Sequence, residues 1–177
     1  YRAMALKLDW LLKQLDRIRM RQEKVIVFCE FRNIQRLLQH YIAEVFGLRA
    51  DIINGDTSAA VGHEASRQKR IKAFQSQPGF GVIILSPVAV GFGVNIQAAN
   101  HVVHYTRTWN PAKEDQATDR AYRIGQTKDV FVYCPVVQAD DFCTFDVKLD
   151  RLLTSKRELA RDMLYGSGGI GPGDVGD

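Results

Sequence analysis

The sequence predicts an α/β domain with a mainly parallel sheet flanked by helices, followed by one long C-terminal helix. Two observations favour this class. Short runs of Val, Ile, Leu and Phe occur without alternating polar residues, which is typical of strands buried on both faces of a parallel sheet. Segments with helical periodicity separate most of these runs, as expected for parallel strands joined by crossover helices.

The first part of the chain contains two helix–strand pairs. Apolar residues at helical spacing predict a helix around 8–18, and the run 25–29 predicts the first buried strand. A second helix over 34–45 is expected to end at Gly47, because glycine readily adopts the left-handed conformation that closes a helix. Residues 50–53 are then expected to form a short second strand before a turn.

The middle of the chain continues the same alternation. A third helix is expected over 63–75, and buried strands are expected over 82–85 and 102–105. Pro111 fits the first turn of a helix, where no N–H is needed, so a fourth helix is expected from there to Tyr122. The remaining expected elements are a last strand over 130–137 and a closing helix from Phe145 to Met163.

The composition excludes several classes of protein. Of the 177 residues, 46% are apolar and 25% are charged, which argues against intrinsic disorder. No apolar run approaches the ~20 residues that cross a bilayer, and no charged segment leads into an apolar one, so we expect a soluble intracellular protein without membrane contact. The three cysteines have no CxxC spacing, so neither a disulfide framework nor a zinc site is indicated.

The distribution of charge is more informative than the net charge of +4. Residues 1–24 carry seven basic and three acidic residues, which accounts for the whole excess. Further basic groups lie within 67–72 and 107–128. Such clusters fit a polyanionic partner such as nucleic acid, and each one alone fits an ordinary solvated helix face equally well.

A glycine-containing loop follows the strand that ends at residue 85. It runs from Ser86 to Asn95 and includes Gly91 and Gly93. Open parallel sheets bind ligands outside the carboxyl ends of their strands, and glycines there let the backbone approach a phosphate or ribose. A tight loop without a ligand is also compatible with this pattern, and the full GxGxxG fingerprint is absent.

The sharpest motif is on the fourth expected helix. Gln116, Arg120 and Arg123 are spaced i, i+4 and i+7, so they lie on one helical face. Two arginines three residues apart form a double fork that suits phosphate oxygens. A surface helix in which Asp119 pairs with Arg123 explains the spacing equally well. Spacing alone leaves both interpretations open.

The stretch from Ser86 to Gln126 closely resembles the C-terminal motor lobe of the Swi/Snf-related, helicase-like ATPases of superfamily two. The resemblance lies in the strings GFGVN, HYTRTWNP and DQATDRAYRIGQ. It extends to VIVFCEF at 25–31, to the segment from Asn54 to Ser58, and to the leading and trailing helices. Roughly residues 5–165 are covered.

The resemblance implies a RecA-like three-layer domain that serves as the second motor lobe of an ATP-dependent double-stranded DNA translocase. It divides the chain into a lead-in helix (1–24), the RecA-like lobe (25–140) and a C-terminal brace helix (141–165). The last twelve residues (166–177) hold six of the fourteen glycines of the chain, and we expect them to form a disordered Gly-rich tail.

The resemblance also implies roles for single residues. Arg120 and Arg123 would be arginine fingers that reach the ATP phosphates, with Gln116 positioning them. The residues implied to face the nucleotide are Gly91, Gly93 and Asn95, the last near the ribose. The residues implied at the DNA-tracking surface are Arg32, Gly55, Thr57, Ser86 and Trp109. For Trp109 the sequence leaves a half-buried core position equally open.

Several positions depart from the usual pattern of the family. Val90 stands where a glycine is common, Pro87-Val88 replaces a more polar pair, and Thr106 stands where an acid is frequent. These departures leave the nucleotide and DNA contacts of this loop open, whereas the helix with the two arginines matches the pattern.

Half of an ATPase site is missing from this sequence. It has no GxxxxGK[ST] phosphate loop and no Asp-Glu pair after a buried strand, and these elements hold the nucleotide phosphates and Mg²⁺. ATP and Mg²⁺ would therefore be held mainly by an N-terminal RecA-like lobe, the expected partner of this one beside double-stranded DNA. We expect the chain alone to be monomeric, without ATPase activity, and at most a weak, salt-sensitive DNA binder.

Two other interpretations compete with the motor lobe. A docking module for nucleic acid or protein could retain the lobe without its catalysis, and its parent protein would also lack a phosphate loop. A Rossmann-like enzyme could bind a cofactor at Gly91-Phe92-Gly93, but the third glycine and an acidic ribose partner are missing. The motor itself would work in a bacterial nucleoid or cytoplasm, or in a nucleus.

Overall fold

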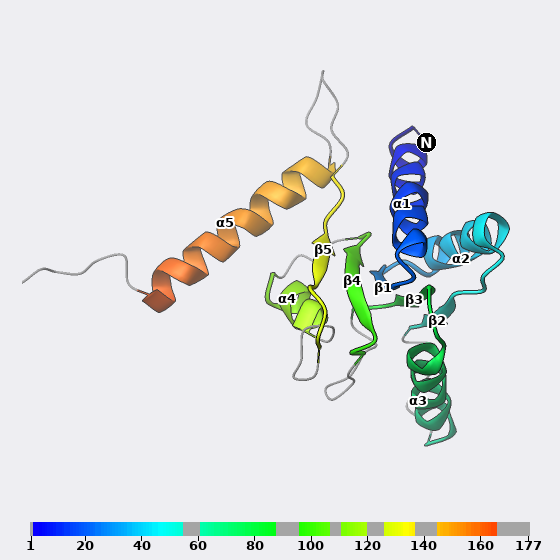
Figure 1. Ribbon diagram of the computed structural model, residues 1–177. Helices are drawn as coiled ribbons and strands as arrows, with labels where there is room; N and C mark the ends of the chain where they lie inside the picture. The colour runs from blue at the N-terminus through cyan, green and yellow to red at the C-terminus, as the bar shows by residue number, and fades with distance from the viewer. Residues whose placement is uncertain are drawn as a thin grey trace, which may run out of the picture.

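A computed structural model describes residues 2–54, 61–87, 96–106, 111–119, 126–136 and 145–165. Within them, helices and strands follow the predicted order (Figure 1). The elements are α1 (Arg2–Met20), β1 (Lys24–Phe28), α2 (Arg32–Phe46), β2 (Asp51–Ile53), α3 (Val61–Ser76), β3 (Gly81–Leu85), β4 (Ala99–His104), α4 (Pro111–Asp119), β5 (Phe131–Tyr133) and α5 (Phe145–Tyr165).

The five strands form one sheet in the order β2-β3-β1-β4-β5. All four pairings are parallel, which confirms the prediction from the continuous apolar runs. Parallel strands end on the same side of a sheet, so the chain leaves every strand at one edge. We call this side the carboxyl edge and the opposite side the amino edge.

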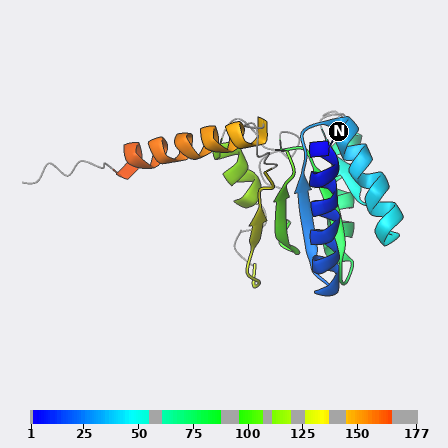
Figure 2. The same cartoon turned by 90° about the horizontal axis from the view of Figure 1, so that it is seen from above.

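Helices cover both faces of the sheet (Figure 2). Helices α1 and α2 pack on one face and α3 packs on the other, because alternate residues of each strand point to opposite sides. The first core contains Leu11, Leu15, Ile18, Leu38 and Ile42 against Val25, Val27, Val82, Ile84 and Val103. The second contains Ile71 and Phe74 against Ile26, Phe28, Ile83, Leu85 and Val102. Burying each large apolar side chain contributes about 1.5–3 kcal/mol to folding.

Helix α2 ends as the sequence predicts. Gly47 has φ 63° and ψ 21°, and its N–H donates to the carbonyl of Ala43. The positive φ belongs to the left-handed region that side chains with a Cβ adopt only at a cost. No atom lies within 4 Å of the position that a Cβ on Gly47 would take, so backbone conformation alone selects glycine here.

Two strands differ from their expected lengths. β4 begins at Ala99 rather than at 102, because the polar side chains of Asn100 and His101 are buried there with polar partners. β5 ends at Tyr133 rather than at 137. Pro135 has no N–H to donate to a ladder, which limits the extension of the strand. Of the fourth helix, expected to reach Tyr122, the described part ends at Asp119.

Helix α5 extends away from the sheet (Figures 1 and 2). Its contact with the body is through α4. Leu149 and Leu153 are buried, and Nη2 of Arg157 lies 3.1 Å from Oδ1 of Asp115 on α4. Farther along the helix, Leu159 is exposed.

Candidate functional site

The carboxyl edge gathers the segments that leave β1, β2, β3 and β4. Backbone hydrogen bonds continue the ladder one residue beyond the strands, from Cys29 N to Leu85 O, from Ser86 N to Ile53 O and from Tyr105 N to Phe28 O, each 2.9 Å long. The exits of the strands are therefore held in register, and the residues that follow them start from fixed positions.

A buried glutamine organises this edge further. Gln35 on α2 is fully buried, and its Nε2 donates to the carbonyl of Cys29 at 2.6 Å. Its Oε1 accepts a hydrogen bond from Nδ2 of Asn54 at 3.0 Å. One side chain thus joins the exits of β1 and β2. Gln35 was not predicted as a site residue, although it lies on the same helical face as Leu38 and Ile42, where a polar residue needs a buried partner.

Thr106 joins the exits of β1 and β4. Its hydroxyl oxygen accepts a hydrogen bond from the backbone N–H of Glu30 at 2.7 Å. This is the position where the sequence departs from the acid that is frequent in the family it resembles. A neutral acceptor is sufficient for the contact that the structure shows.

Helix α4 is anchored to the carboxyl end of β4. Oγ1 of Thr118 lies 3.0 Å from Nε2 of His104, whose ring stacks on Phe28 with centroids 5.4 Å apart. Gln116 precedes Thr118 by two residues, about 200° around the helix, and its side chain is exposed. The anchor therefore leaves the Gln116 face of α4 open to solvent.

The structure places three of the predicted site residues. Arg32 is exposed at the start of α2, after β1, and Ser86 is 7% exposed directly after β3. Since β1 and β3 are neighbours, the fold brings both residues to the carboxyl edge. Gln116 lies on α4. The other predicted residues lie outside the described residues: Gly55, Thr57, Gly91, Gly93, Asn95, Trp109, Arg120 and Arg123.

A half-buried lysine and a buried thiol lie at this edge, and exposed cations lie along α3. Lys7 of α1 lies over the ring of Tyr105, 5.3 Å from its centroid. Burial raises the pKa of the Cys29 thiol, so this thiol stays protonated at neutral pH. On α3, Lys69, Arg70 and Lys72 are exposed, and Nη1 of Arg70 lies 3.4 Å from the carbonyl oxygen of Ile52.

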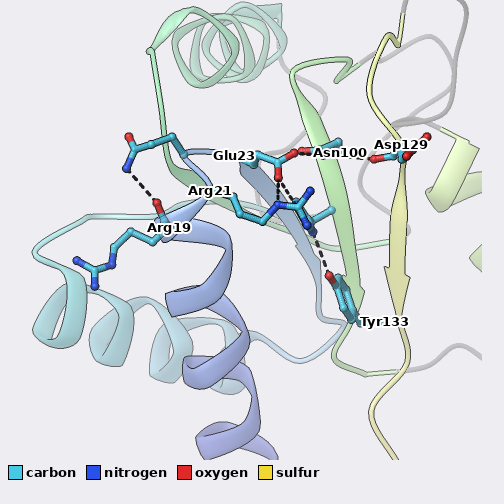
Figure 3. Close-up of polar contacts among 8 residues, drawn as sticks. Arg19, Arg21, Glu23, Asn100, Asp129 and Tyr133 are labelled. Atoms are coloured by element: carbon cyan, nitrogen blue, oxygen red, sulfur yellow. Dashed lines mark hydrogen bonds and ion pairs between the residues drawn. The ribbon is translucent and has the colours of Figure 1, made fainter.

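The amino edge carries a separate buried polar cluster (Figure 3). The Glu23 carboxylate accepts a hydrogen bond from Nδ2 of Asn100, and its Oε1 lies 2.5 Å from Nε of Arg21 and 3.4 Å from Nε2 of His101. Nδ1 of His101 lies 3.1 Å from the hydroxyl of Tyr133. The cluster connects the α1–β1 turn to β4 and β5.

The cluster sets the ionisation of its members. Burial raises the pKa of Glu23, but hydrogen bonds from Asn100 and His101 outweigh it, so the pKa lies below its ordinary value. Burial lowers the pKa of His101, and the Glu23 carboxylate offsets this only in part. The lowered pKa favours the neutral form of His101, whose Nε2 lies toward the Glu23 carboxylate and whose Nδ1 lies toward the hydroxyl of Tyr133.

The described ranges contain no group of three or more His, Cys, Asp or Glu side chains that could hold a metal ion. No helix in that part of the chain has both the length and the apolar character needed to cross a membrane.

The sequence matches one protein family across most of its length. Residues 6–125 match the family described as the helicase conserved C-terminal domain. The Zorya protein ZorD of Escherichia coli O139:H28 (strain E24377A / ETEC) is 63% identical over 159 residues, which are 89% of this chain and 15% of that protein. The chain thus spans about a sixth of the length of this curated relative.

Solved structures agree with the sequence match. The C-terminal part of the Fun30 ATPase domain has a TM-score of 0.70 at 28% identity, covering 90% of this chain and 52% of that one. The Sulfolobus solfataricus SWI2/SNF2 ATPase core in complex with dsDNA has a TM-score of 0.67 at 31% identity, covering 91% of this chain and 32% of that one. The α/β sheet is therefore the RecA-like fold of these lobes, and the chain belongs to the helicase conserved C-terminal domain family as a Swi/Snf-related C-terminal lobe.

Proposed function

We propose that the chain is the second motor lobe of an ATP-dependent double-stranded DNA translocase, to which it contributes arginine fingers and DNA-tracking contacts. The observation that carries this proposal is the contact between Thr118 and His104, 3.0 Å long, which fixes α4 to the carboxyl end of β4. Arg120 and Arg123 follow Thr118 by two and five residues. The proposal assigns them to this same edge, because parallel sheets bind ligands there.

The donors at this edge fit a ligand that carries phosphates. Gln116 and Arg32 present an exposed amide and an exposed guanidinium, and in this proposal Arg120 and Arg123 supply two further guanidinium groups. Arginine binds phosphate oxygens bidentately, and an arginine finger neutralises the charge that develops during phosphoryl transfer. ATP, when bound, supplies the anhydride bond that is hydrolysed. In this proposal the phosphate loop and the Mg²⁺ ligands belong to the N-terminal RecA-like lobe, because the sequence contains neither of the motifs that form them.

DNA contact is proposed for the same side of the molecule. Arg32 and the glycine, hydroxyl and aromatic residues named for the tracking surface follow the carboxyl ends of strands in the sequence. Such groups hold phosphates without reading bases. The related Sulfolobus ATPase core in complex with dsDNA supports this assignment. Because contacts to phosphates release counterions, binding should weaken steeply as salt rises.

The proposal includes inactivity of the chain by itself. Without the phosphate loop of the other lobe, the arginines have no bound phosphates to act on. We propose that the isolated chain is a monomer that hydrolyses no ATP, and that the complete protein works where DNA is, in a nucleoid or a nucleus.

The test compares variants of a protein that joins this chain to its N-terminal lobe. Arg120→Ala should lower the DNA-stimulated rate of ATP hydrolysis by about 10³–10⁵-fold, which is the range for removal of an arginine finger. Binding of ATP and DNA, followed by fluorescence anisotropy, should change little. Arg49→Ala is the control, since Arg49 is an exposed arginine that precedes β2 at the amino edge.

Two results would contradict this function. Undiminished turnover in Arg120→Ala removes the arginine-finger role. Robust Mg²⁺-dependent ATP hydrolysis by the isolated chain shows that no second lobe is required.

A further inference from the structure

One flank of α1 carries a row of cationic, amide and aromatic side chains. The row has no acidic member, and its members are spaced alternately three and four residues apart, which aligns them along one side of a helix. They are Lys7, Trp10, Gln14, Arg17 and Arg21, and we call this row the α1 stripe. Because each residue of a helix adds about 1.5 Å, the α1 stripe is about 21 Å long.

Contacts with β5 show where the α1 stripe lies. The rings of Trp10 and Tyr133 meet edge to face, with centroids 6.2 Å apart. The guanidinium of Arg21 lies over Phe131, 5.1 Å from the centroid of the ring. Burial raises the pKa of Tyr133, and the nearby charges of Arg21 and Arg17 oppose this shift. The α1 stripe therefore runs beside β5, which is the outermost strand on its side of the sheet.

The cations of α1 that lie off the stripe have acidic partners on the same helix. Nζ of Lys13 lies 2.8 Å from Oδ2 of Asp9, and Nη2 of Arg19 lies 2.6 Å from Oδ1 of Asp16. By contrast, the side chain of Arg17 is exposed and forms no hydrogen bond or ion pair with any described residue. Its positive charge is therefore available to an anion from outside the chain.

Arg21 has an acidic partner but still presents its charge to solvent. Its Nε lies 2.5 Å from Oε1 of Glu23, whose side chain is 8% exposed while that of Arg21 is 55% exposed. Figure 3 shows Arg21 directed toward β4 and Arg19 directed away from it. Because the Glu23 carboxylate and the Phe131 ring hold the guanidinium in place, little conformational freedom is left for it to lose on binding.

We propose that the α1 stripe is a second contact surface for DNA, which binds phosphates of the duplex backbone through Arg17 and Arg21. This surface lies outside the proposed motor site and rests on the proposed function only for the identity of the polyanion. The two arginines are four residues apart, about 6 Å along the helix. One strand of a duplex carries a phosphate every ~3.4 Å along its axis, so both guanidinium groups can contact the same strand.

The remaining members of the α1 stripe fit the same ligand. Lysine and glutamine side chains, like arginine, commonly donate to phosphate oxygens without reading the bases, and Gln14 lies between the aromatic and the arginine part of the stripe. Lys7 lies over the ring of Tyr105, directly after β4. The stripe thus begins at the carboxyl edge, where DNA contact is proposed, which favours DNA over a separate acidic protein as its ligand.

The experiment measures how duplex binding depends on salt in the protein that joins this chain to its N-terminal lobe. Fluorescence anisotropy gives Kd for duplex DNA between about 50 and 200 mM salt. Each lost phosphate contact should reduce the slope of log Kd against log salt by about 0.9. Over this fourfold range, the affinity of the parent should therefore fall about 12-fold more than that of the double variant Arg17→Gln, Arg21→Gln. Arg17→Gln alone should show about half of the change in slope.

The matched control is the double variant Lys13→Gln, Arg19→Gln. It removes the same charge from the same helix but off the stripe, so the long-range attraction of DNA falls equally in both double variants. Its salt slope should remain that of the parent. Arg21→Gln also removes a partner of Glu23, so the melting temperature of each variant is measured. If the first double variant melts early, Arg17→Gln carries the test, because its side chain has no ion pair to lose.

The outcomes separate this inference from the proposed function. Equal slopes in the two double variants, or an unchanged slope in Arg17→Gln, overturn the stripe as a DNA contact. A labelled poly-glutamate peptide tests the other class of partner: if the Arg17 variants lose its binding while their DNA slope is unchanged, the stripe binds an acidic protein segment and the inference is wrong. In each of these cases, DNA-stimulated ATP hydrolysis by the parent keeps the motor function. A parent that binds no duplex DNA removes both proposals.

Discussion

Replacing Glu23 by Leu should destabilise the isolated chain strongly, because it leaves buried donors without their acceptor. Asn100 and His101 are each 1% exposed; Nδ2 of Asn100 donates to the Glu23 carboxylate, and Nε2 of His101 lies 3.4 Å from it. A buried donor that loses its partner costs about 1–3 kcal/mol. The Arg21 side chain is 55% exposed and returns to solvent, so its loss adds at most about 1 kcal/mol. We therefore expect the free energy of unfolding to fall by about 3–5 kcal/mol, the range found when one partner of a buried pair is removed.

The measurement is urea unfolding of the purified chain at pH 7.5, followed by circular dichroism. Glu23→Gln, which keeps one acceptor oxygen, should lie between the parent and Glu23→Leu. Glu44→Leu is the control, because Glu44 forms a comparable carboxylate–histidine contact with His40, at 3.2 Å, while both side chains are about 60% exposed. It should change stability by less than about 1 kcal/mol. Equal effects of Glu23→Leu and Glu44→Leu would refute the argument that burial makes the amino-edge cluster costly to break.

Three further predictions concern the same chain. Its stability should fall as pH drops below about 6.5, because the pKa of His101 is lowered in the folded chain and the unfolded chain therefore takes up a proton first. It should fall again below about 4.5, because the pKa of Glu23 is also lowered in the folded chain. Thermal unfolding between about pH 3 and pH 8 measures both steps, and Glu23→Gln should remove the lower one. Gly47→Ala should cost about 1–2 kcal/mol in urea unfolding, and a neutral result would contradict the left-handed end of α2. Thr118→Val should cost about 1 kcal/mol and shift the imidazole ¹⁵N resonances of His104; unmoved resonances would exclude the contact that anchors α4.

The strands buried on both faces were predictable from the sequence. Apart from Lys24, β1 and β3 are continuous runs without polar residues, and every one of their residues is buried, so composition alone identified them. The start of β4 escaped prediction because Asn100 and His101 are polar. They are acceptable in the strand because groups distant in sequence, Glu23, Asp129 and Tyr133, provide polar partners. The end of β5 was placed too late because apolar residues around Pro135 suggested a strand that a proline cannot extend.

In the candidate site, too, the features set by the order of elements could be predicted, and the contacts between residues distant in sequence could not. The order of elements implied that the residues after β1 and β3 would share one edge, and the structure places Arg32 and Ser86 there. The ties made by Gln35 and Thr106 could not be predicted, since each depends on which strand exits lie side by side. Gln126 ends the string DQATDRAYRIGQ, but the sequence does not reveal its hydrogen bonds with the carbonyls of Gln97 and Ala99, which form only in the folded chain.

The hydrogen bonds between the strand exits have a practical consequence. Gln35, Asn54 and Thr106 hold the carboxyl edge with amides, a hydroxyl and backbone groups, none of which carries a charge. Salt screens charged pairs but leaves neutral hydrogen bonds almost unchanged. Raising the ionic strength should therefore weaken the proposed binding of a polyanion at the carboxyl edge without weakening the hydrogen bonds that hold this edge together. A salt titration would then measure the strength of binding and not a loss of structure.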